Sequence, residues 1–190
     1  MRLREKGTVD RVKGSSPVGT YDGFPEIIHG FGRYQSHLSI QELKKLIFVL
    51  MSDLNERRLT YPMSVVNREG VFEGEISFEI GIAEGNWFNY LDSSELKRLK
   101  DTMLDSSLPL DFLMILRYKY QRSGRDASLR SDHYLVRYLF REGEFDILLS
   151  HERGIRRYQM DELLNLLDSM IRQKSAERRR RIKRVEMRAL

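Results

Sequence analysis

Two alternating segments joined by a two-residue turn constrain this chain most strongly. His133–Arg141 and Phe145–Ser150 each alternate apolar and polar residues, and Glu142-Gly143 lies between them. Glycine supplies the positive φ that a tight turn needs, so the pattern predicts an antiparallel hairpin. Counting outward from the turn gives the cross-strand pairs Arg141 with Glu144, Phe140 with Phe145, Tyr138 with Ile147, Val136 with Leu149 and Tyr134 with His151. One face of this hairpin is therefore apolar and has to be covered.

Apolar residues at helical spacing predict three helices that could provide the cover. Ser39 and Glu42 form a capping box, and the apolar stripe that follows predicts a helix over roughly 40–57. A second helix is predicted to begin at Asp92, with Glu95 three residues later, and a third begins near Met160. Each helix has an apolar side that can pack on a sheet.

Further alternating segments predict that the hairpin belongs to a larger meander. The predicted strands are Tyr61–Asn67, Phe72–Ile82, Asn86–Leu91 and Phe112–Gln121, with turns at Glu69-Gly70 and Glu84-Gly85. We expect Phe24–Tyr34 to be an irregular extended segment and Ser123–Asp132 to be a polar loop. The fold class predicted is α+β: an antiparallel β-meander sheet covered on one face by helices.

The ends of the chain differ in composition from this core. Residues 1–24 are rich in glycine, serine and charge, which predicts a flexible N-terminal arm with a short strand near Thr8–Val12. Residues 25–172 make up the predicted core domain. No proline or glycine separates the third helix from residues 173–190, so we expect a basic C-terminal helical tail that continues it.

Positive charge is concentrated in this tail. Arg172–Leu190 contains nine basic and two acidic residues, a charge of +7, whereas the whole chain carries +5. The rest of the chain therefore sums to −2. A cationic segment on a near-neutral body favours a polyanionic partner, above all nucleic acid. The alternatives are an acidic protein surface and a helix terminus stabilised by its dipole.

The strands provide a second candidate surface, because aromatic and basic residues alternate along them. Tyr118 and Tyr120 alternate with Arg117 and Lys119, and the segment 133–141 repeats this pattern with Arg137. If the rings are exposed, they form a stacking platform for single-stranded nucleic acid. Strand alternation favours the other arrangement, in which the rings pack under the helices and the cations occupy the open face.

These features predict a non-enzymatic protein that binds single-stranded DNA or RNA mainly through phosphate contacts. No helix-turn-helix, zinc finger or basic-region zipper is recognisable that would enter a duplex groove. The candidate contact residues are Arg117, Lys119, Tyr120, Arg122, Arg125, Arg130, Arg137, Arg153, Arg156, Arg157, Arg178, Arg179, Arg180, Arg181, Lys183 and Arg184. The alternative is an assembly module, a homo-oligomer or a subunit of a larger complex, anchored by its basic tail.

Other classes of function find no support in the residues. The chain has no cysteine, and its four histidines lack metal-ligand spacing, so we expect neither a metal nor a cofactor. Nucleotide-binding glycine loops, a GxSxG elbow and an HExxH motif are all absent, so we assign no catalytic residue. No run of apolar residues is long enough to span a bilayer, and we expect a cytoplasmic protein without a membrane partner.

Overall fold

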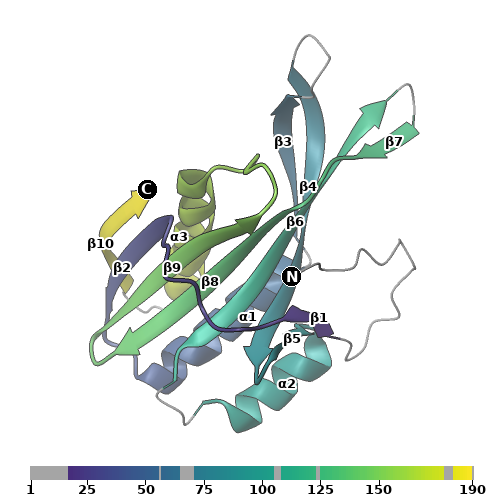
Figure 1. Ribbon diagram of the computed structural model, residues 1–190. Coiled ribbons are helices and arrows are strands. Elements are labelled where there is room, and N and C mark those ends of the chain that lie inside the picture. Colours follow the sequence, from purple (N-terminus) through teal and green to yellow (C-terminus); the bar gives the residue numbers. More distant parts are fainter. Residues whose placement is uncertain are drawn as a thin grey trace.

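A computed structural model describes residues 17–55, 57–64, 71–104, 108–122, 125–177 and 182–189. In this part of the chain, a ten-stranded antiparallel sheet is accompanied by three helices (Figure 1). The elements in chain order are β1 (Pro17–Thr20), β2 (Gly30–Ser36), α1 (Ile40–Asn55), β3 (Arg58–Ser64), β4 (Val71–Glu84), β5 (Trp87–Tyr90), α2 (Ser93–Thr102), β6 (Leu110–Arg122), β7 (Arg125–Ser128), β8 (Asp132–Arg141), β9 (Glu144–Arg153), α3 (Met160–Glu177) and β10 (Ile182–Ala189).

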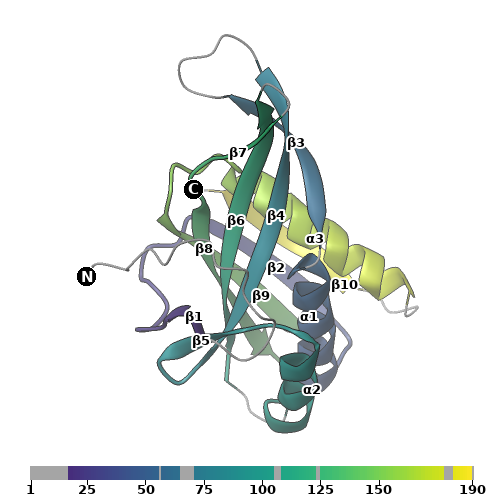
Figure 2. The same ribbon diagram turned by 90° about the vertical axis from the view of Figure 1, so that its right-hand side faces the viewer.

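The sheet order is β1-β5-β4-β6-β8-β9-β2-β10, and two further strands extend it as hairpin partners, β3 beside β4 and β7 beside β6. Figure 2 shows the helices gathered on one side of the sheet. The predicted α+β class with an antiparallel sheet is confirmed. Within the described residues, none of the helices combines the length and apolarity needed to cross a bilayer.

The hairpin predicted from alternation is β8–β9, and its register is confirmed. Phe140 lies opposite Phe145 and Tyr134 opposite His151. Gly143 in the turn has a φ of 75°, which residues with a side chain rarely adopt. The two strands lie at the centre of the sheet, so their apolar face forms much of the main core.

The helix starts predicted from capping residues are also confirmed. The Ser39 amide donates to Glu42 Oε2 at 3.0 Å, and the Glu42 amide donates back to Ser39 Oγ at 3.3 Å. At the start of α2, Asp92 accepts hydrogen bonds from the amides of Ser94 and Glu95. The Glu95 side chain does not complete a capping box there, because it binds Arg98 instead.

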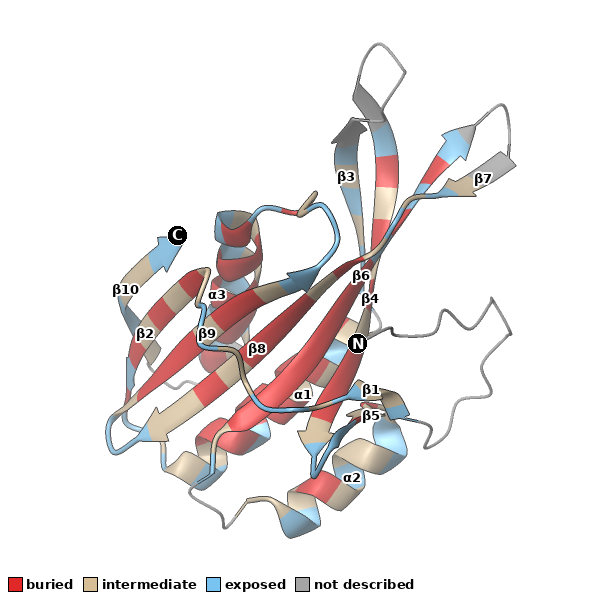
Figure 3. Ribbon diagram, in the orientation of Figure 1, coloured by how far each residue is buried: buried red, intermediate tan, exposed pale blue. Residues whose placement is uncertain are grey.

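Two apolar clusters lie on the two faces of the sheet, and buried residues are concentrated along its long strands and on the helices α1 and α3 (Figure 3). The larger lies between the sheet and the helices. The smaller lies on the other side, which we call the open face, where the described N-terminal residues 17–28, here called the strap, cross the strands (Figure 2). Val18, Tyr21 and Phe24 of the strap pack against Leu113 and Leu135 there. The strap covers apolar residues of the sheet that no helix reaches.

The predicted helical extension of α3 is wrong. The helix ends at Glu177, and Ile182–Ala189 form β10, which pairs antiparallel with β2 at the edge of the sheet. Ile182 and Met187 pack partly against the core from this strand. The edge of β2 offers backbone donors and acceptors that a strand satisfies and a solvent-exposed helix does not, which favours pairing. Residues 178–181 lie outside the described part of the chain.

Three other segments also contain strands that the sequence did not predict. Residues 125–128 of the expected polar loop form β7, and Gly30–Ser36 form β2 between β9 and β10. Pro17–Thr20 of the expected flexible arm form β1, which pairs with β5. The predicted strand at Thr8–Val12 and the turn at Glu69-Gly70 lie outside the described residues.

Asp132 is a fully buried carboxylate that ties the sheet to the chain entering α3. Its Oδ2 accepts from the Tyr118 hydroxyl at 2.6 Å and from the Arg157 amide at 2.7 Å. Its Oδ1 accepts from the Arg156 amide at 2.9 Å. Gly154 lies against this carboxylate with a φ of 111°, so a Cβ there would collide with Asp132. Hydrogen bonds to a buried charge are among the stronger ones in proteins, so this junction is rigid.

We predict that Asp132→Asn destabilises the protein by about 2 to 4 kcal/mol, because an amide nitrogen then faces an N–H or O–H donor. Urea denaturation should give a lower midpoint with an unchanged slope. The exposed Asp22→Asn variant is the control and should match the parent protein. If Asp132→Asn lowers the free energy of unfolding by less than about 0.5 kcal/mol, the Asp132 carboxylate does not stabilise the contact between the sheet and the chain entering α3.

Candidate nucleic-acid interface

The aromatic residues of β6 and β8 face the helices. Tyr118, Tyr134 and Tyr138 are almost fully buried, and Tyr120 is 9% exposed. The Tyr134 hydroxyl donates to the Tyr158 carbonyl at 2.6 Å. The interpretation that the rings pack under the helices is therefore confirmed for Tyr118, Tyr134 and Tyr138, which belong to the core between the sheet and the helices. Because Tyr120 is buried as well, these four rings do not form a stacking platform. Burial also raises the pKa of the Tyr134 and Tyr138 hydroxyls.

The open face of the sheet carries the expected arginines, but carboxylates neutralise them. Arg117 binds Glu79 from the neighbouring strand through Nε at 3.0 Å. Arg137 makes a two-pronged ion pair with Asp111, with both N–O distances at 2.7 Å. These two residues belong to charge pairs rather than to an uncompensated basic surface.

The strap completes the environment of Arg137. The Tyr21 hydroxyl donates to Asp111 and accepts from Arg137. The Phe24 ring lies 4.6 Å from the Arg137 guanidinium carbon, a cation–π contact. Burial and the Asp111 charge raise the pKa of Tyr21 to about 12. The pKa of Arg137 is raised, chiefly by its hydrogen bonds to Asp111.

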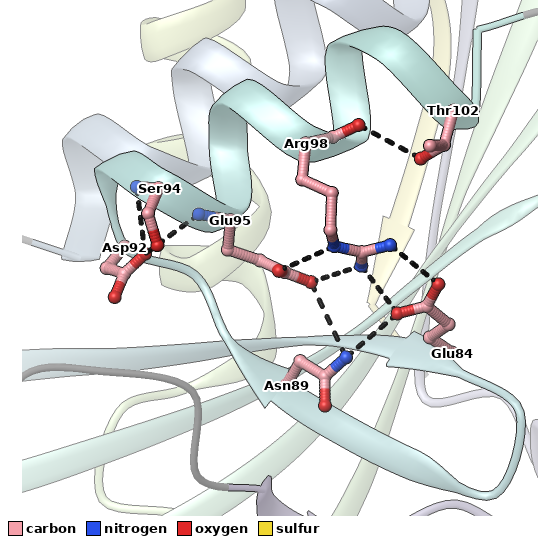
Figure 4. Close-up of polar contacts among 7 residues, drawn as sticks. All are labelled: Glu84, Asn89, Asp92, Ser94, Glu95, Arg98 and Thr102. Carbon is pink, nitrogen blue, oxygen red and sulfur yellow. Dashed lines mark hydrogen bonds and ion pairs between the residues drawn. The ribbon is translucent and has the colours of Figure 1, made fainter.

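The same matching of charges recurs elsewhere in the structure. Arg33 of β2 and Arg141 of β8 both bind the buried Asp146, at 2.8 and 2.9 Å. At the corner between β5 and α2, Arg98 lies between Glu84 and Glu95, and its closest approach to Glu84 is 2.5 Å (Figure 4). A cation held this way is a poor phosphate contact, because its carboxylate partner would have to be displaced.

The C-terminal cations divide into paired and unpaired groups. Arg184 lies 3.1 Å from Asp168 of α3, which also binds Arg172, and Arg188 is paired with Glu186. Lys183 is exposed, and no hydrogen bond or ion pair joins it to another described residue. Arg178–Arg181 lie outside the described residues, between Glu177 at the end of α3 and Ile182 at the start of β10.

The β6–β7 hairpin and the chain that follows it carry two exposed cations. Lys119 and Arg130 are exposed, and neither forms a hydrogen bond or ion pair with another described residue. Glu75 lies opposite Lys119 on β4, but it is paired with Arg58 at 3.4 Å. At the end of the hairpin, Arg122 and Arg125 are cross-strand partners.

Arg153, Arg156 and Arg157 lie at the end of β9 and in the chain that leads to α3. The amides of Arg156 and Arg157 are used to bind Asp132, and Arg156 has a φ of 54°. Arg153 is the cross-strand partner of His133. Arg153 and Arg157 both have further interaction partners within the protein.

The pKa values of two histidines near Arg153 and Arg156 are lowered. The pKa of His133 is lowered by burial and then by the charges of Arg153 and Arg117. The pKa of His29 is lowered by burial and then by Arg156 and His151. His29 Nδ1 also accepts a hydrogen bond from the His151 amide at 3.1 Å, which requires this nitrogen to be unprotonated. Both imidazoles are held neutral in a locally positive environment.

Within the described residues, no group of three or more histidine and carboxylate side chains could hold a metal ion. No protein-family model matches the chain, and neither the curated proteins nor the solved structures contain a match. The arrangement of charges is therefore the basis for inferring a function.

The structure brings only some of the candidate residues together. Lys119, Arg122, Arg125 and Arg130 share one hairpin, whereas Arg117 and Arg137 belong to ion pairs on the open face. These residues look like one basic surface in the sequence, because Glu79 and Asp111, which pair with the arginines, lie on other strands or far away in the chain. The signal available was the nearly acid-free segment around 119–130, in which Asp126 is the one acidic residue.

We predict that stability falls as the pH drops below about 6.5, the ordinary pKa of histidine. The folded-state pKa values of His29 and His133 are lowered, so the unfolded chain binds protons first and acidification favours unfolding. The stabilisation from keeping them neutral is complete above pH 6.5 and is lost as the pH falls toward the lowered values. Thermal melting between pH 5 and 8 measures this.

The double variant His29→Gln/His133→Gln should reduce the pH dependence, because glutamine does not titrate. The exposed His37→Gln variant is the matched control and should keep the full dependence. Identical pH profiles for all three proteins would contradict the assignment.

Proposed function

We propose that this protein binds nucleic acid through phosphate contacts and acts by binding rather than by catalysis. The observation that carries the proposal is the concentration of positive charge near the C-terminus, where the sequence has four consecutive arginines, Arg178–Arg181, followed by the exposed Lys183. Arginines of the open face, by contrast, have carboxylate partners. A cluster of cations on a near-neutral body favours a polyanion, because binding releases its condensed counterions.

The structure gives less support to the expected preference for single-stranded nucleic acid. One reason for that expectation was that exposed aromatic rings would stack on bases, and the tyrosines of β6 and β8 are buried instead. The proposal therefore keeps the phosphate contacts and the basic segment of the original hypothesis. The face of the sheet contributes less than expected, because Arg117 and Arg137 are already paired.

The alternative function is an assembly module, and one observation favours it. β10 ends the sheet order, so its outer edge is where another strand could add. Val185 is 52% exposed on this strand. The strand also has features that disfavour pairing, since the register shifts between Arg184 and Glu186 and charged residues dominate it. Bulges and charges protect natural sheet edges, so we place nucleic-acid binding first.

We predict that replacing Arg178–Arg181 with glutamine weakens binding to a 20-nucleotide DNA or RNA by at least about tenfold at 0.1 M salt. The slope of log affinity against log salt should fall by about three to four, because four phosphate contacts are removed. Fluorescence anisotropy over a salt series measures both quantities.

The control variant replaces four exposed cations of α1, α2, β3 and the chain before β3 with glutamine: Lys45, Lys97, Arg58 and Arg57. It changes the net charge equally and should bind almost as tightly as the parent. A salt slope near zero for the parent protein would sink the proposal. A discrete oligomer that persists at 1 M salt, seen by light scattering, would favour the assembly function.

A further inference from the structure

One part of the open face lies between the strap and the turn that joins β8 to β9. Figure 1 shows this face toward the viewer, and no described segment crosses β2, β8 and β9 there. Phe31, Leu139 and Leu148 are half-buried on these three strands, and neither apolar cluster of the sheet includes them. Among the described residues, this apolar patch is therefore without cover.

The neighbours of Phe31 give this patch an aromatic and cationic character. Alternate residues of β2 are buried toward the helices, so Phe31 and Arg33 lie on the open face. Phe31 is the cross-strand partner of Leu148 on β9 and of Arg188 on β10. The Arg33 guanidinium carbon lies 5.4 Å from the centroid of the Phe31 ring. A half-buried ring thus lies between cations of two strands.

Asp146 fixes the orientation of the Arg33 guanidinium. Its two carboxylate oxygens accept from Arg33 Nε at 2.8 Å and from Nη2 at 2.9 Å. These bonds use the edge of the guanidinium and leave the faces of its plane without hydrogen bonds, and the side chain is 35% exposed. A base can stack on a guanidinium plane as it does on an aromatic ring. Arg33 can therefore stack on a base without displacing Asp146, although it is a poor phosphate contact.

We propose that single-stranded nucleic acid stacks its bases on Phe31 and Arg33 while its phosphates contact Lys183 and the arginines that precede it in the sequence. The inference rests on the proposed function, because it names the form of nucleic acid and the surface that binds its bases. Lys183 is the cross-strand partner of Gln35, and both are exposed. Gln35 and Phe31 lie about 13 Å apart along β2, so one short strand can reach both.

The chemistry of the patch favours a single strand over other partners. Bases of a duplex are paired and stacked on one another, whereas unpaired bases are free to stack on rings and guanidinium planes. The neighbouring Arg188 and Lys183 favour a polyanion over an apolar protein surface. Stacking contributes affinity that does not depend on salt, in contrast to phosphate contacts.

The test uses the variant Phe31→Leu, which keeps an apolar side chain and removes the ring. Its affinity for a 20-nucleotide single strand should fall by at least about fivefold, with an unchanged slope of log affinity against log salt. The control Trp87→Leu removes a ring that is 51% exposed on β5, near the opposite edge of the sheet, and should bind like the parent. Thermal melting establishes that both variants are folded. Comparing an RNA strand with the DNA strand of the same sequence identifies the preferred sugar.

Stacking has a second readout that simple charge attraction would not give. Trp87 is the single tryptophan of the chain, so the variant Phe31→Trp/Trp87→Leu has its only indole at position 31. A saturating single strand should quench the fluorescence of this indole, because a base stacks on it. Unchanged fluorescence at saturation would overturn the stacking contact.

The outcomes separate this inference from the proposed function. Loss of binding with the Arg178–Arg181 variant but none with Phe31→Leu would overturn the stacking surface and leave phosphate binding standing. A DNA duplex that binds the parent as tightly as its single strand would also overturn the stacking surface, since unpaired bases would then play no part. If the parent binds neither single strands nor duplex, both ideas are wrong.

Discussion

The pairing of arginines with buried carboxylates on the open face decides what this sheet can do. Helices cover one face, and the strap covers only part of the other. Cross-strand ion pairs also stabilise this face: Arg137 with Asp111 in contact with the strap, and Arg33 with Asp146 between β2 and β9. A buried carboxylate without its cation destabilises a fold, so the first role of these arginines is to stabilise the sheet. The same pairing neutralises the surface that the sequence presented as basic.

This constraint also explains the strap. Leu113, Ile115 and Leu135 would leave an apolar patch on the open face if nothing crossed them. Tyr21 and Phe24 cover the patch and bind the charge pair beside it, one through its hydroxyl and the other through its ring. Apolar and polar contacts thus fix the same segment, and the glycine- and serine-rich composition near the N-terminus did not reveal this.

What could be predicted from the sequence follows from the range of the interactions involved. The β8–β9 register and the start of α1 depend on residues within a few positions of each other, so Gly143 and Ser39 were sufficient to place them. β10 and β2 pair with partners far away in the chain, and neither has a clean alternation of its own. β7 has four residues, too few for periodicity to show. The carboxylate partners of the arginines were hidden for the same reason, because Asp111 and Asp146 lie on other strands.

The fate of the basic tail shows why a count of cations is a poor guide to a binding site. Lys183, Arg184 and Arg188 belong to an edge strand, where charge discourages unwanted pairing, and two of them are held by acidic partners. Their charge therefore has a structural explanation that needs no ligand. Lys119 and Arg130 are exposed and have no such partner among the described residues, and Arg178–Arg181 lie outside the described part of the chain. Cations that fold stability requires are matched by the protein itself, so those that stay unmatched are the ones to examine for a partner.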